Sequence, residues 1–310
     1  MSFRHLITLQ ELPKEDIQEI LNLAQSFKQV ILRPIKKVPT LKGKTIVNMF
    51  FEPSTRTRTS FELAAKRLSA DVLNIQMSTS SVVKGETLLD TLATIEAMQI
   101  DMVVIRHSAS GVPLFLTKNI KSSVINAGDG MHEHPTQGLL DMFSIIEKKK
   151  KIEGLNVSIV GDIAHSRVAR SNIWGLTKMG AKVKVVGPTT LMPKEIEKLG
   201  VTVCNDLKEG LKDADVVNIL RVQLERQKKN LFPTLREYAT LFGVNSEKLK
   251  YAKPDCVVMH PGPMNRGIEI SPNVADGVNS VINEQVTNGV AVRMAVLYLM
   301  GGGKKDEAFN

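Results

Sequence analysis

The chain has 310 residues, a length that predicts two domains, each large enough to bury its own core. Its 43% hydrophobic and 24% charged residues are typical of a globular protein and exclude a chain that is disordered by composition. The net charge of +9 fits several kinds of anionic partner, but only 5% of residues are aromatic and no basic stripe is interleaved with rings, so we expect no binding to nucleic acid.

The start of the chain and its apolar runs bear on its location. The opening MSFRHLITLQELPKEDIQ lacks the features of a signal peptide, and no uninterrupted apolar run approaches the ~20 residues of a membrane span. We therefore expect a cytoplasmic protein that is not bound to a membrane. Cys204 and Cys256 lie far apart without the spacing of a zinc site or a redox pair, and we predict that both are small buried hydrophobes.

The first half of the chain alternates short β-rich runs with helical patterns. Leu88, Leu89, Leu92 and Ile95, for example, keep one face of a helical pattern apolar. This alternation predicts βαβ units and a parallel sheet whose strands are buried on both faces. The predicted strands are residues 44–51, 71–77, 101–107 and 122–128.

A second series of strands and helices follows the lysine-rich residues 147–154, which we interpret as the domain boundary. A last helix, at about residues 283–300, has no strand after it and is expected to pack back on the first domain. The predicted fold class is α/β, with two domains that each contain a parallel β-sheet flanked by helices. The predicted domains are residues 1–150 with the C-terminal helix 284–310, and residues 151–283.

The stretch FFEPSTRTRTSFELAAKRL places hydroxyls and arginines where a strand turns into a helix. Ser54, Thr55, Arg56 and Thr57 fall in the predicted first helical turn, where main-chain N–H groups and the helix dipole attract an anion. Hydroxyls and a guanidinium are donors suited to phosphate oxygens. The alternative is an ordinary N-cap at Ser54 followed by surface arginines. A cap accounts for only one of the hydroxyls, so the pattern favours a phosphate site.

Two other basic residues of the first domain allow two interpretations each. Lys84, in the polar stretch STSSVVKGETLLDT, is either a solvated lysine or part of a flexible lid that brings an ammonium group to a phosphate. Arg106, at the end of the buried run DMVVIRH, is either a ligand contact or part of an ion pair at a domain interface.

The stretch NAGDGMHEHPTQGLLDMF contains a His-x-His pair, His132 and His134. A hydrolytic metal site would need more histidines and carboxylates in register, and we predict no metal. Alternatively, His134 precedes a helix with Pro135 at its first position, and His134 and Gln137 then face one ligand. A neutral imidazole beside several cations is better suited to polarise a carbonyl than to act as a general base.

Polar residues also follow the strands of the second domain. The stretch SIVGDIAHSRVARSNIWG lacks the G-x-G-x-x-G pattern, so we expect no nicotinamide cofactor. Its Arg167, at the predicted start of a helix, can pair with a carboxylate. Arg221, Gln223 and Arg226 follow another strand in NILRVQLERQ. Together with the phosphate site of the first domain, these side chains suggest a dicarboxylate as the second substrate.

In order and spacing, these motifs resemble those of the aspartate/ornithine carbamoyltransferase superfamily, and within it the aspartate carbamoyltransferase catalytic chains. The resemblance covers essentially the whole chain and rests on FFEPSTRTRTSFE, SSVVKGETLLDT, NAGDGMHEHPTQGLLD, VGDIAHSRVARS, LRVQLERQ and MHPGPMNRG. The first motif is shared across the superfamily. The last two discriminate, because ornithine enzymes typically carry His-Cys-Leu-Pro where this chain has His260, Pro261 and Gly262.

The resemblance implies transfer of the carbamoyl group of carbamoyl phosphate to the amine of L-aspartate, in de novo pyrimidine biosynthesis, without a metal, a cofactor or a covalent enzyme intermediate. It implies that Thr57, Arg106 and His134 polarise the carbonyl oxygen, and these with Lys84 are the expected catalytic residues. The expected carbamoyl phosphate ligands are Ser54, Thr55, Arg56, Thr57, Arg106, His134, Gln137, Gly262 and Pro263. The expected aspartate ligands are Lys84, Arg167, Arg221 and Gln223.

The resemblance also implies a homotrimer whose active sites are shared between chains. This chain departs from many relatives in having Val83, where they have a second lysine. Glu52 is expected to bridge to Arg167 and Arg226 when the domains close. The family leaves open whether a regulatory chain or a dihydroorotase associates with the trimer. The residues expected to reach a neighbouring chain's site are Lys84 and either Ser80 or Ser81.

Three other functions stay open at this point. An ornithine-type carbamoyltransferase differs only in its acceptor. A non-catalytic two-domain protein would bind carbamoyl phosphate without turnover. A metallohydrolase built on His132 and His134 would lose its activity on chelation.

Overall fold

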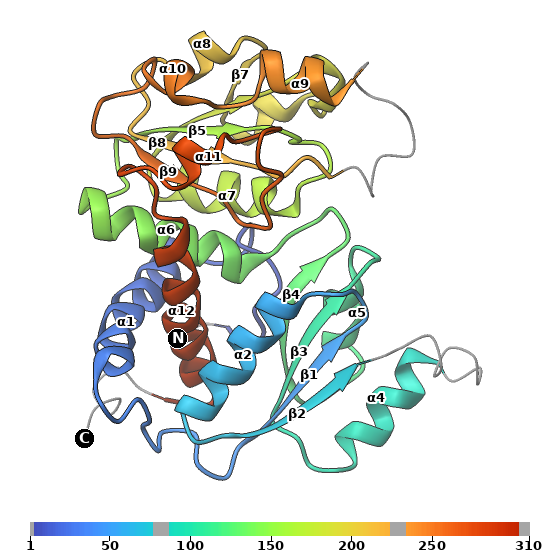
Figure 1. Cartoon of the computed structure of the whole chain (residues 1–310). Coiled ribbons are helices and arrows are strands. Elements are labelled where there is room, and N and C mark those ends of the chain that lie inside the picture. Colours follow the sequence, from blue (N-terminus) through green and yellow to red (C-terminus); the bar gives the residue numbers. More distant parts are fainter. Residues whose placement is uncertain (1–2, 77–86, 224–233, 304–310) are drawn as a thin grey trace. The chain divides into compact units, whose positions relative to one another are not determined.

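The computed structural model describes residues 3–76, 87–223 and 234–303, and the chain divides into two compact units (Figure 1). Unit 1 comprises residues 1–139 and 287–310, and unit 2 comprises residues 140–286. Both divisions fall inside helices, so each of these helices contributes to both units. The two helices are α6 (Pro135–Lys149) and α12 (Ile282–Met300).

Unit 1 is built on a parallel sheet with the strand order β2-β1-β3-β4. One face of the sheet packs against α4 (Leu88–Glu96) and α5 (Val112–Thr117) in an apolar cluster that includes Val47, Met49 and Ile105. The predicted parallel sheet of the first domain is therefore confirmed. The strands are β1 (Thr45–Phe50), β2 (Asp71–Gln76), β3 (Met102–His107) and β4 (Ser123–Asp129).

The C-terminal helix α12 packs against the first domain, as predicted. The ring of Tyr298 on α12 lies 5.6 Å from that of Phe27, edge to face. Arg293 Nη1 donates to Ser60 Oγ at 2.9 Å, and the Arg293 guanidinium lies 5.0 Å from the centre of the Phe61 ring. Its partners belong to two helices that lie beside it (Figure 1), α1 (Lys14–Leu32) and α2 (Thr55–Arg67).

Unit 2 contains a second parallel sheet, with the strand order β7-β6-β5-β8-β9. Its strands are β5 (Asn156–Val160), β6 (Lys182–Val186), β7 (Thr202–Cys204), β8 (Val216–Ile219) and β9 (Val257–Met259). The other elements are α7 (Arg167–Lys178), α8 (Leu207–Leu211), α9 (Leu235–Leu241), α10 (Ser246–Leu249), α11 (Pro272–Ala275) and the 3₁₀ turns η1 (Thr189–Leu191) and η2 (Ile196–Leu199).

The expectation that every strand is buried on both faces is wrong at the sheet edges. Leu73 on the edge strand β2 is 43% exposed. Cys204 on the edge strand β7 is only partly buried, whereas Cys256 is buried as predicted. An edge strand has one neighbour instead of two, so its side chains keep more contact with water.

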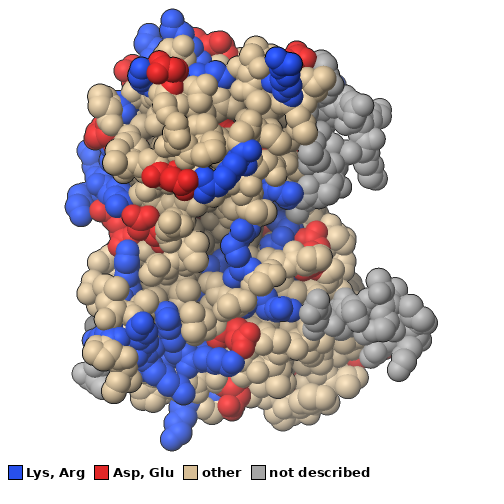
Figure 2. All heavy atoms as spheres, in the orientation of Figure 1, with Lys and Arg blue, Asp and Glu red and all other residues tan. Residues whose placement is uncertain are grey.

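The surface charge is mixed. Figure 2 shows both acidic and basic side chains on each unit. In this view, the basic side chains are not confined to one unit. Within the described ranges, no helix is both long and apolar enough to cross a membrane.

Candidate active site

The strand order of unit 1 determines where a ligand can bind. In the order β2-β1-β3-β4 the chain changes direction across the sheet between β1 and β3, and ligands of open α/β sheets bind at the carboxyl ends of such a strand pair. Phe50 at the end of β1 is paired with Arg106 on β3, and His107 is paired with Asp129 at the end of β4. The segments that follow β1 and β4 therefore begin beside the end of β3.

Helix α2 begins at Thr55, immediately after this crossing point. Ser54 stands at the N-cap position, but its side chain accepts no capping hydrogen bond. The Arg58 N–H donates to the Ser54 carbonyl at 3.1 Å, and at a helix start the N–H groups of the first turn point out of the helix, where they can meet an anion. Thr57 is buried, while Thr55 and Arg56 are exposed. The capping bond that defines the alternative, an ordinary serine N-cap, is therefore not made by Ser54.

Arg106 has a carboxylate partner within unit 1. Its Nε lies 3.2 Å from Glu52 Oε2, and both side chains are largely buried, with 14% and 20% of their surfaces exposed. Its Nη1 donates to the Ala127 carbonyl at 3.5 Å. The Phe51 N–H donates to the Arg106 carbonyl at 2.9 Å, which extends the pairing of β1 and β3. An arriving phosphate would compete with Glu52 for this guanidinium.

His134 and Gln137 are brought to the same helix start, as the sequence predicts. Helix α6 begins at Pro135, and the carbonyl of His134 accepts from the N–H groups of Gln137 and Gly138 at 2.9 and 3.2 Å. His134 and Gln137 are 4% and 8% exposed. Both side chains are thus held in nearly buried positions after β4.

Two carboxylates that the sequence analysis did not single out hold this segment. Asp129 accepts from the Gly111 N–H at 2.7 Å and from Asn126 Nδ2 at 2.8 Å, and its Oδ2 lies 3.0 Å from His132 Nδ1. Burial opposes ionisation of Asp129, but hydrogen bonds from His132, Gly111 and Asn126 outweigh it and hold the pKa of the carboxyl below its ordinary value of 3.8. His132 therefore faces Asp129.

Glu133 is the second of these carboxylates. Its oxygens accept from the main-chain N–H groups of Leu9 and Gln10 at 2.9 and 3.3 Å. These partners lie near the start of the chain, where no local pattern connects them to Glu133. Within the three described ranges, no group of three or more His, Cys, Asp or Glu side chains is arranged to hold a metal ion.

Unit 2 has its own crossing point, between β5 and β8. Gly161 follows β5 with φ 134°, and a Cβ there would lie 3.1 Å from the Cβ and carbonyl oxygen of Leu220. The close approach of the two chain segments requires glycine. Arg221 and Gln223 follow at the end of β8, on the side where ligands are expected.

Arg167 occupies the first position of α7 and is 3% exposed. Ser166 caps this helix by accepting from the Ala169 N–H at 3.1 Å. The buried Asp162, between β5 and α7, lies with Oδ1 2.8 Å from His165 Nδ1. Gly262 and Pro263, joined by a cis peptide bond, follow β9 next to β8.

The predicted site residues fall into two groups, each within one unit. Those predicted in unit 1, named the unit 1 site, are Glu52, Ser54, Thr55, Arg56, Thr57, Arg106, His134 and Gln137. Those predicted in unit 2, named the unit 2 site, are Arg167, Arg221, Gln223, Gly262 and Pro263. The predicted residues Ser80, Ser81, Lys84 and Arg226 lie outside the described residues.

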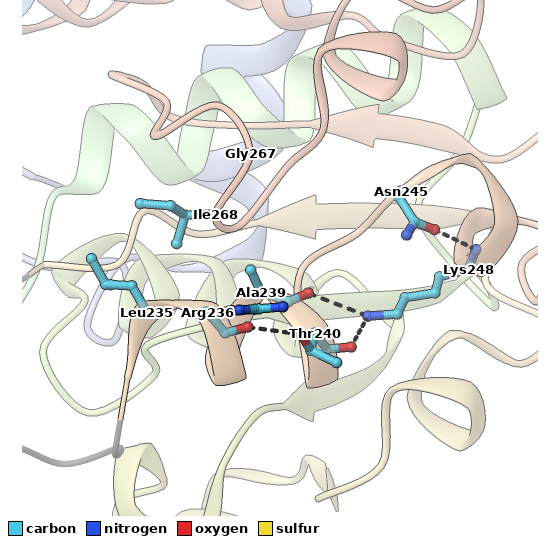
Figure 3. A pocket seen from close by; sticks show the side chains of 8 residues that line it. All are labelled: Leu235, Arg236, Ala239, Thr240, Asn245, Lys248, Gly267 and Ile268. Atoms are coloured by element: carbon cyan, nitrogen blue, oxygen red, sulfur yellow. Dashed lines mark hydrogen bonds between the residues drawn. The ribbon is translucent and has the colours of Figure 1, made fainter.

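A pocket of about 590 Å³ lies elsewhere in unit 2, between α9, α10 and residues 267–268 (Figure 3). Its Lys248 Nζ already donates to the carbonyls of Ala239, Thr240 and Gly243, at 3.5, 2.6 and 3.0 Å. None of the described site residues lines it. This ammonium group ties α9 to α10, and the pocket offers no arrangement that fits the predicted chemistry.

The chain is similar over nearly its full length to proteins named aspartate carbamoyltransferase catalytic subunit. The chain is 61% identical over 306 residues to the aspartate carbamoyltransferase catalytic subunit of Endomicrobium trichonymphae, covering 99% of this chain and 98% of the relative. It is 62% identical over 299 residues to the protein of the same name from Halothermothrix orenii, covering 96% of each.

Solved structures give the same result. An ornithine carbamoyltransferase from Pyrococcus furiosus superposes with a TM-score of 0.85 at 33% identity, covering 97% of this chain and 98% of that one. An aspartate transcarbamoylase from Trypanosoma cruzi, solved with aspartate and phosphate, has a TM-score of 0.83 at 29% identity, covering 95% and 94%.

Two domain models of one family match successive parts of the chain. Residues 4–147 match the aspartate/ornithine carbamoyltransferase carbamoyl-P binding domain, and residues 153–300 match the Asp/Orn binding domain. The two matches together span almost the whole chain. The chain therefore belongs to the aspartate/ornithine carbamoyltransferase family.

Proposed function

We propose that this chain is the catalytic chain of an aspartate carbamoyltransferase. It transfers the carbamoyl group of carbamoyl phosphate to the amine of L-aspartate and releases phosphate, in de novo pyrimidine biosynthesis. One observation carries the proposal. Hydrogen-bond donors suited to phosphate lie where the sheet of unit 1 changes direction, and arginines lie where the sheet of unit 2 does. The chain's relatives at about 60% identity bear the corresponding name.

The unit 1 site would hold the phosphate group of carbamoyl phosphate. Ser54, Thr55, Arg56 and Thr57 supply main-chain N–H groups, hydroxyls and a guanidinium at the start of α2. Arg106 would exchange its contact with Glu52 for the incoming phosphate. A guanidinium that is preorganised and largely buried needs little rearrangement to stabilise the added negative charge.

The reacting carbonyl would be polarised by three side chains of unit 1. Thr57, Arg106 and His134 would direct donors at its oxygen, where negative charge develops as the amine attacks. Gln137 and the main chain at Gly262 and Pro263 would orient the carbamoyl nitrogen. A C–N bond forms, the bond between carbon and the bridging phosphate oxygen breaks, and the departing phosphate takes the proton of the amine. Alignment of the two reactants supplies much of the acceleration.

The unit 2 site would hold L-aspartate. Arg167 and Arg221 are suited to its two carboxylates, because a guanidinium binds a carboxylate through two parallel hydrogen bonds. Gln223 adds an amide close to Arg221 in the chain, and the Lys84 of a neighbouring chain would complete the site. An ornithine side chain ends in a cation, which these arginines would repel.

The assembly is proposed to be a cytoplasmic homotrimer in which Lys84, with Ser80 or Ser81, serves a neighbouring chain's site. On substrate binding, Glu52 would leave Arg106 and pair with Arg167 and Arg226. A regulatory chain or a dihydroorotase is a further candidate partner of the trimer.

The second candidate function is ornithine carbamoylation. It is favoured by the TM-score of 0.85 with an ornithine carbamoyltransferase. That likeness covers the shared fold, whereas acceptor choice depends on the residues after β8 and β9. Arg221 and Gln223 match a dicarboxylate, and the segment after His260 lacks the His-Cys-Leu-Pro pattern of ornithine enzymes.

Product formation by the purified chain tests the proposal. The chain is incubated with carbamoyl phosphate and either L-aspartate or L-ornithine, with and without EDTA. We expect carbamoyl-aspartate from aspartate alone, at a rate that EDTA does not change. Product from ornithine would favour the second candidate. Loss of transfer in EDTA would mean that the reaction needs a metal, and EDTA-sensitive breakdown of carbamoyl phosphate without any carbamoylated amine would point to the metallohydrolase alternative.

A further inference from the structure

His260 follows β9 directly and is held on several sides within unit 2. The residue is 2% exposed. Its main-chain N–H donates to Gln285 Oε1 at 3.0 Å. Its ring Nδ1 accepts from the Gly262 N–H at 2.8 Å, and its Nε2 lies 3.3 Å from Glu269 Oε1.

These contacts assign the proton of the ring. A nitrogen that accepts a hydrogen bond from a main-chain N–H carries a lone pair, so Nδ1 of His260 is unprotonated. The single ring proton is therefore on Nε2, facing the carboxylate of Glu269. A proton on Nδ1 would place two donors against each other at the Gly262 N–H.

Both sides of this histidine are themselves anchored. Gln285 Nε2 donates to Asp141 Oδ1 at 2.8 Å, and Asn172 Nδ2 donates to Asp141 Oδ2 at 2.7 Å. Asp141, Asn172 and Gln285 are all buried. The main chain at His260 is thus connected through Gln285 to Asp141 on α6 and Asn172 on α7, both within unit 2.

On the other side of His260, the side chain of Glu269 is hydrogen-bonded to the segment that follows β9. Glu269 is fully buried and accepts from Asn265 Nδ2 at 3.1 Å and from the Asn265 main-chain N–H. Asn265 Nδ2 also donates to the carbonyl of Val222 at 3.3 Å. Val222 lies between Arg221 and Gln223, so Asn265 connects the segment after β8 both to the segment after β9 and to the buried carboxylate of Glu269.

We propose that His260 is a positioning residue for carbamoyl transfer: through Nδ1 it holds the Gly262 N–H and so directs the main chain of Gly262 and Pro263 toward the carbamoyl nitrogen. The inference rests on the proposed function, which places these two residues at that nitrogen. His260 itself touches no substrate in this account. Its Nδ1 accepts from the Gly262 N–H on one side, and its Nε2 lies 3.3 Å from the buried carboxylate of Glu269 on the other.

Two substitutions of His260 each preserve a polar atom at only one of the two ring-nitrogen positions, so they test the two contacts separately. In His260→Asn the amide oxygen takes the place of Nδ1 and can still accept from Gly262, but the side chain is too short to reach Glu269. In His260→Gln the amide reaches the position of Nε2, and the acceptor for Gly262 is lost. A buried N–H left without an acceptor is costly, so His260→Gln should bind carbamoyl phosphate about tenfold more weakly than His260→Asn.

Calorimetric titration with carbamoyl phosphate measures this difference, and steady-state kinetics give the KM for each substrate. We expect the difference between the variants in the Kd and KM for carbamoyl phosphate, with KM for aspartate changed less. A purely structural role would instead lower the melting temperatures without such a split. His5, in unit 1, provides a matched control, because its Nδ1 accepts from the Val124 N–H at 3.1 Å. His5→Asn and His5→Gln should bind carbamoyl phosphate equally well.

Equal Kd values for the two His260 variants would overturn the proposal. A second measurement uses the wild-type protein and needs no variant to fold: ¹⁵N NMR of labelled histidine should show His260 with Nδ1 unprotonated and Nε2 protonated. A proton on Nδ1 would also overturn the proposal. A wild-type chain that binds carbamoyl phosphate but transfers nothing would contradict the proposed function alone, because the comparison of Kd values remains valid.

Discussion

Arg106 and Glu52 form an ion pair that compensates the charge of a largely buried arginine. A largely buried guanidinium without a counter-ion is costly, because burial removes its hydration. Glu52 lies 3.2 Å from Arg106 and offsets that cost. In the proposed reaction the phosphate of carbamoyl phosphate would replace this contact, and Glu52 would thereby tune the affinity of Arg106 for phosphate.

Arg106→Ala tests the role of this guanidinium. Removal of one donor to a developing oxyanion typically lowers kcat by about 10²-fold or more, and we expect a loss of that size. Steady-state kinetics with both substrates measure it. Arg33→Ala, which removes an exposed arginine at the end of α1, serves as the control and should leave kcat unchanged. A kcat for Arg106→Ala within threefold of wild type would refute the assigned role.

Local patterns carry only part of the site. Ser54 to Thr57 and Arg106 could be predicted because strand ends and helix starts are visible in a short window of sequence. The residues that hold the site in place could not. Glu133 binds the N–H groups of Leu9 and Gln10, and Glu269 faces His260, so their partners lie outside any local pattern.

At the scale of secondary-structure elements, the turn between β4 and α6 determines where His134 lies. Asp129 at its start gathers N–H donors from Gly111, Asn126 and Glu133. The strands themselves were predictable, because central strands of a parallel sheet are continuous apolar runs. The edge strands were predicted less well, since sequence does not reveal which strand lacks a second neighbour, as Leu73 on β2 shows.

The lowered pKa of Asp129 predicts how stability varies with pH. The pKa in the folded protein lies below the unfolded value, so this carboxylate stabilises the fold above the ordinary pKa of 3.8, and the contribution is lost as pH falls through the folded pKa. Asp129→Asn should therefore lower the free energy of unfolding by about 2 kcal/mol at neutral pH, and by less below the ordinary pKa.

Urea unfolding of both proteins at a series of pH values measures this difference. Asp255→Asn is a suitable control, because Asp255 pairs with Lys149 but is exposed, and an exposed pair contributes little. A gap between wild type and Asp129→Asn that stays constant from neutral pH to below the ordinary pKa would contradict the role given to this carboxylate.

At the level of the whole molecule, the two units share one architecture, a parallel sheet flanked by helices. In each unit the predicted site residues follow the strands on either side of the point where the sheet changes direction, together with the next strand of the sheet, β4 in unit 1 and β9 in unit 2. The paired α/β organisation was predictable from the two series of strands on either side of the lysine-rich segment. The exact division was harder to place, because α6 and α12 each run through both units.

If active sites are shared within a trimer, defective chains should complement one another. Chains carrying Arg106→Ala are mixed with chains carrying Lys84→Ala, and the subunits are exchanged. A random mixture of the two should regain about a quarter of the wild-type activity, because some sites then receive both native residues. Each variant put through the same exchange alone is the control. Failure to regain activity after demonstrated exchange would indicate that each chain carries a complete site.

The central claim is that this chain carbamoylates aspartate, and a competition in one reaction mixture tests it most directly. The purified chain is given carbamoyl phosphate labelled with ¹³C in the carbonyl group, together with equal concentrations of L-aspartate and L-ornithine, and the products are followed by ¹³C NMR. We predict that the label appears in N-carbamoyl-L-aspartate and none in citrulline. Label in citrulline, or decay of the labelled carbamoyl phosphate with no transfer to either amine, would contradict the account.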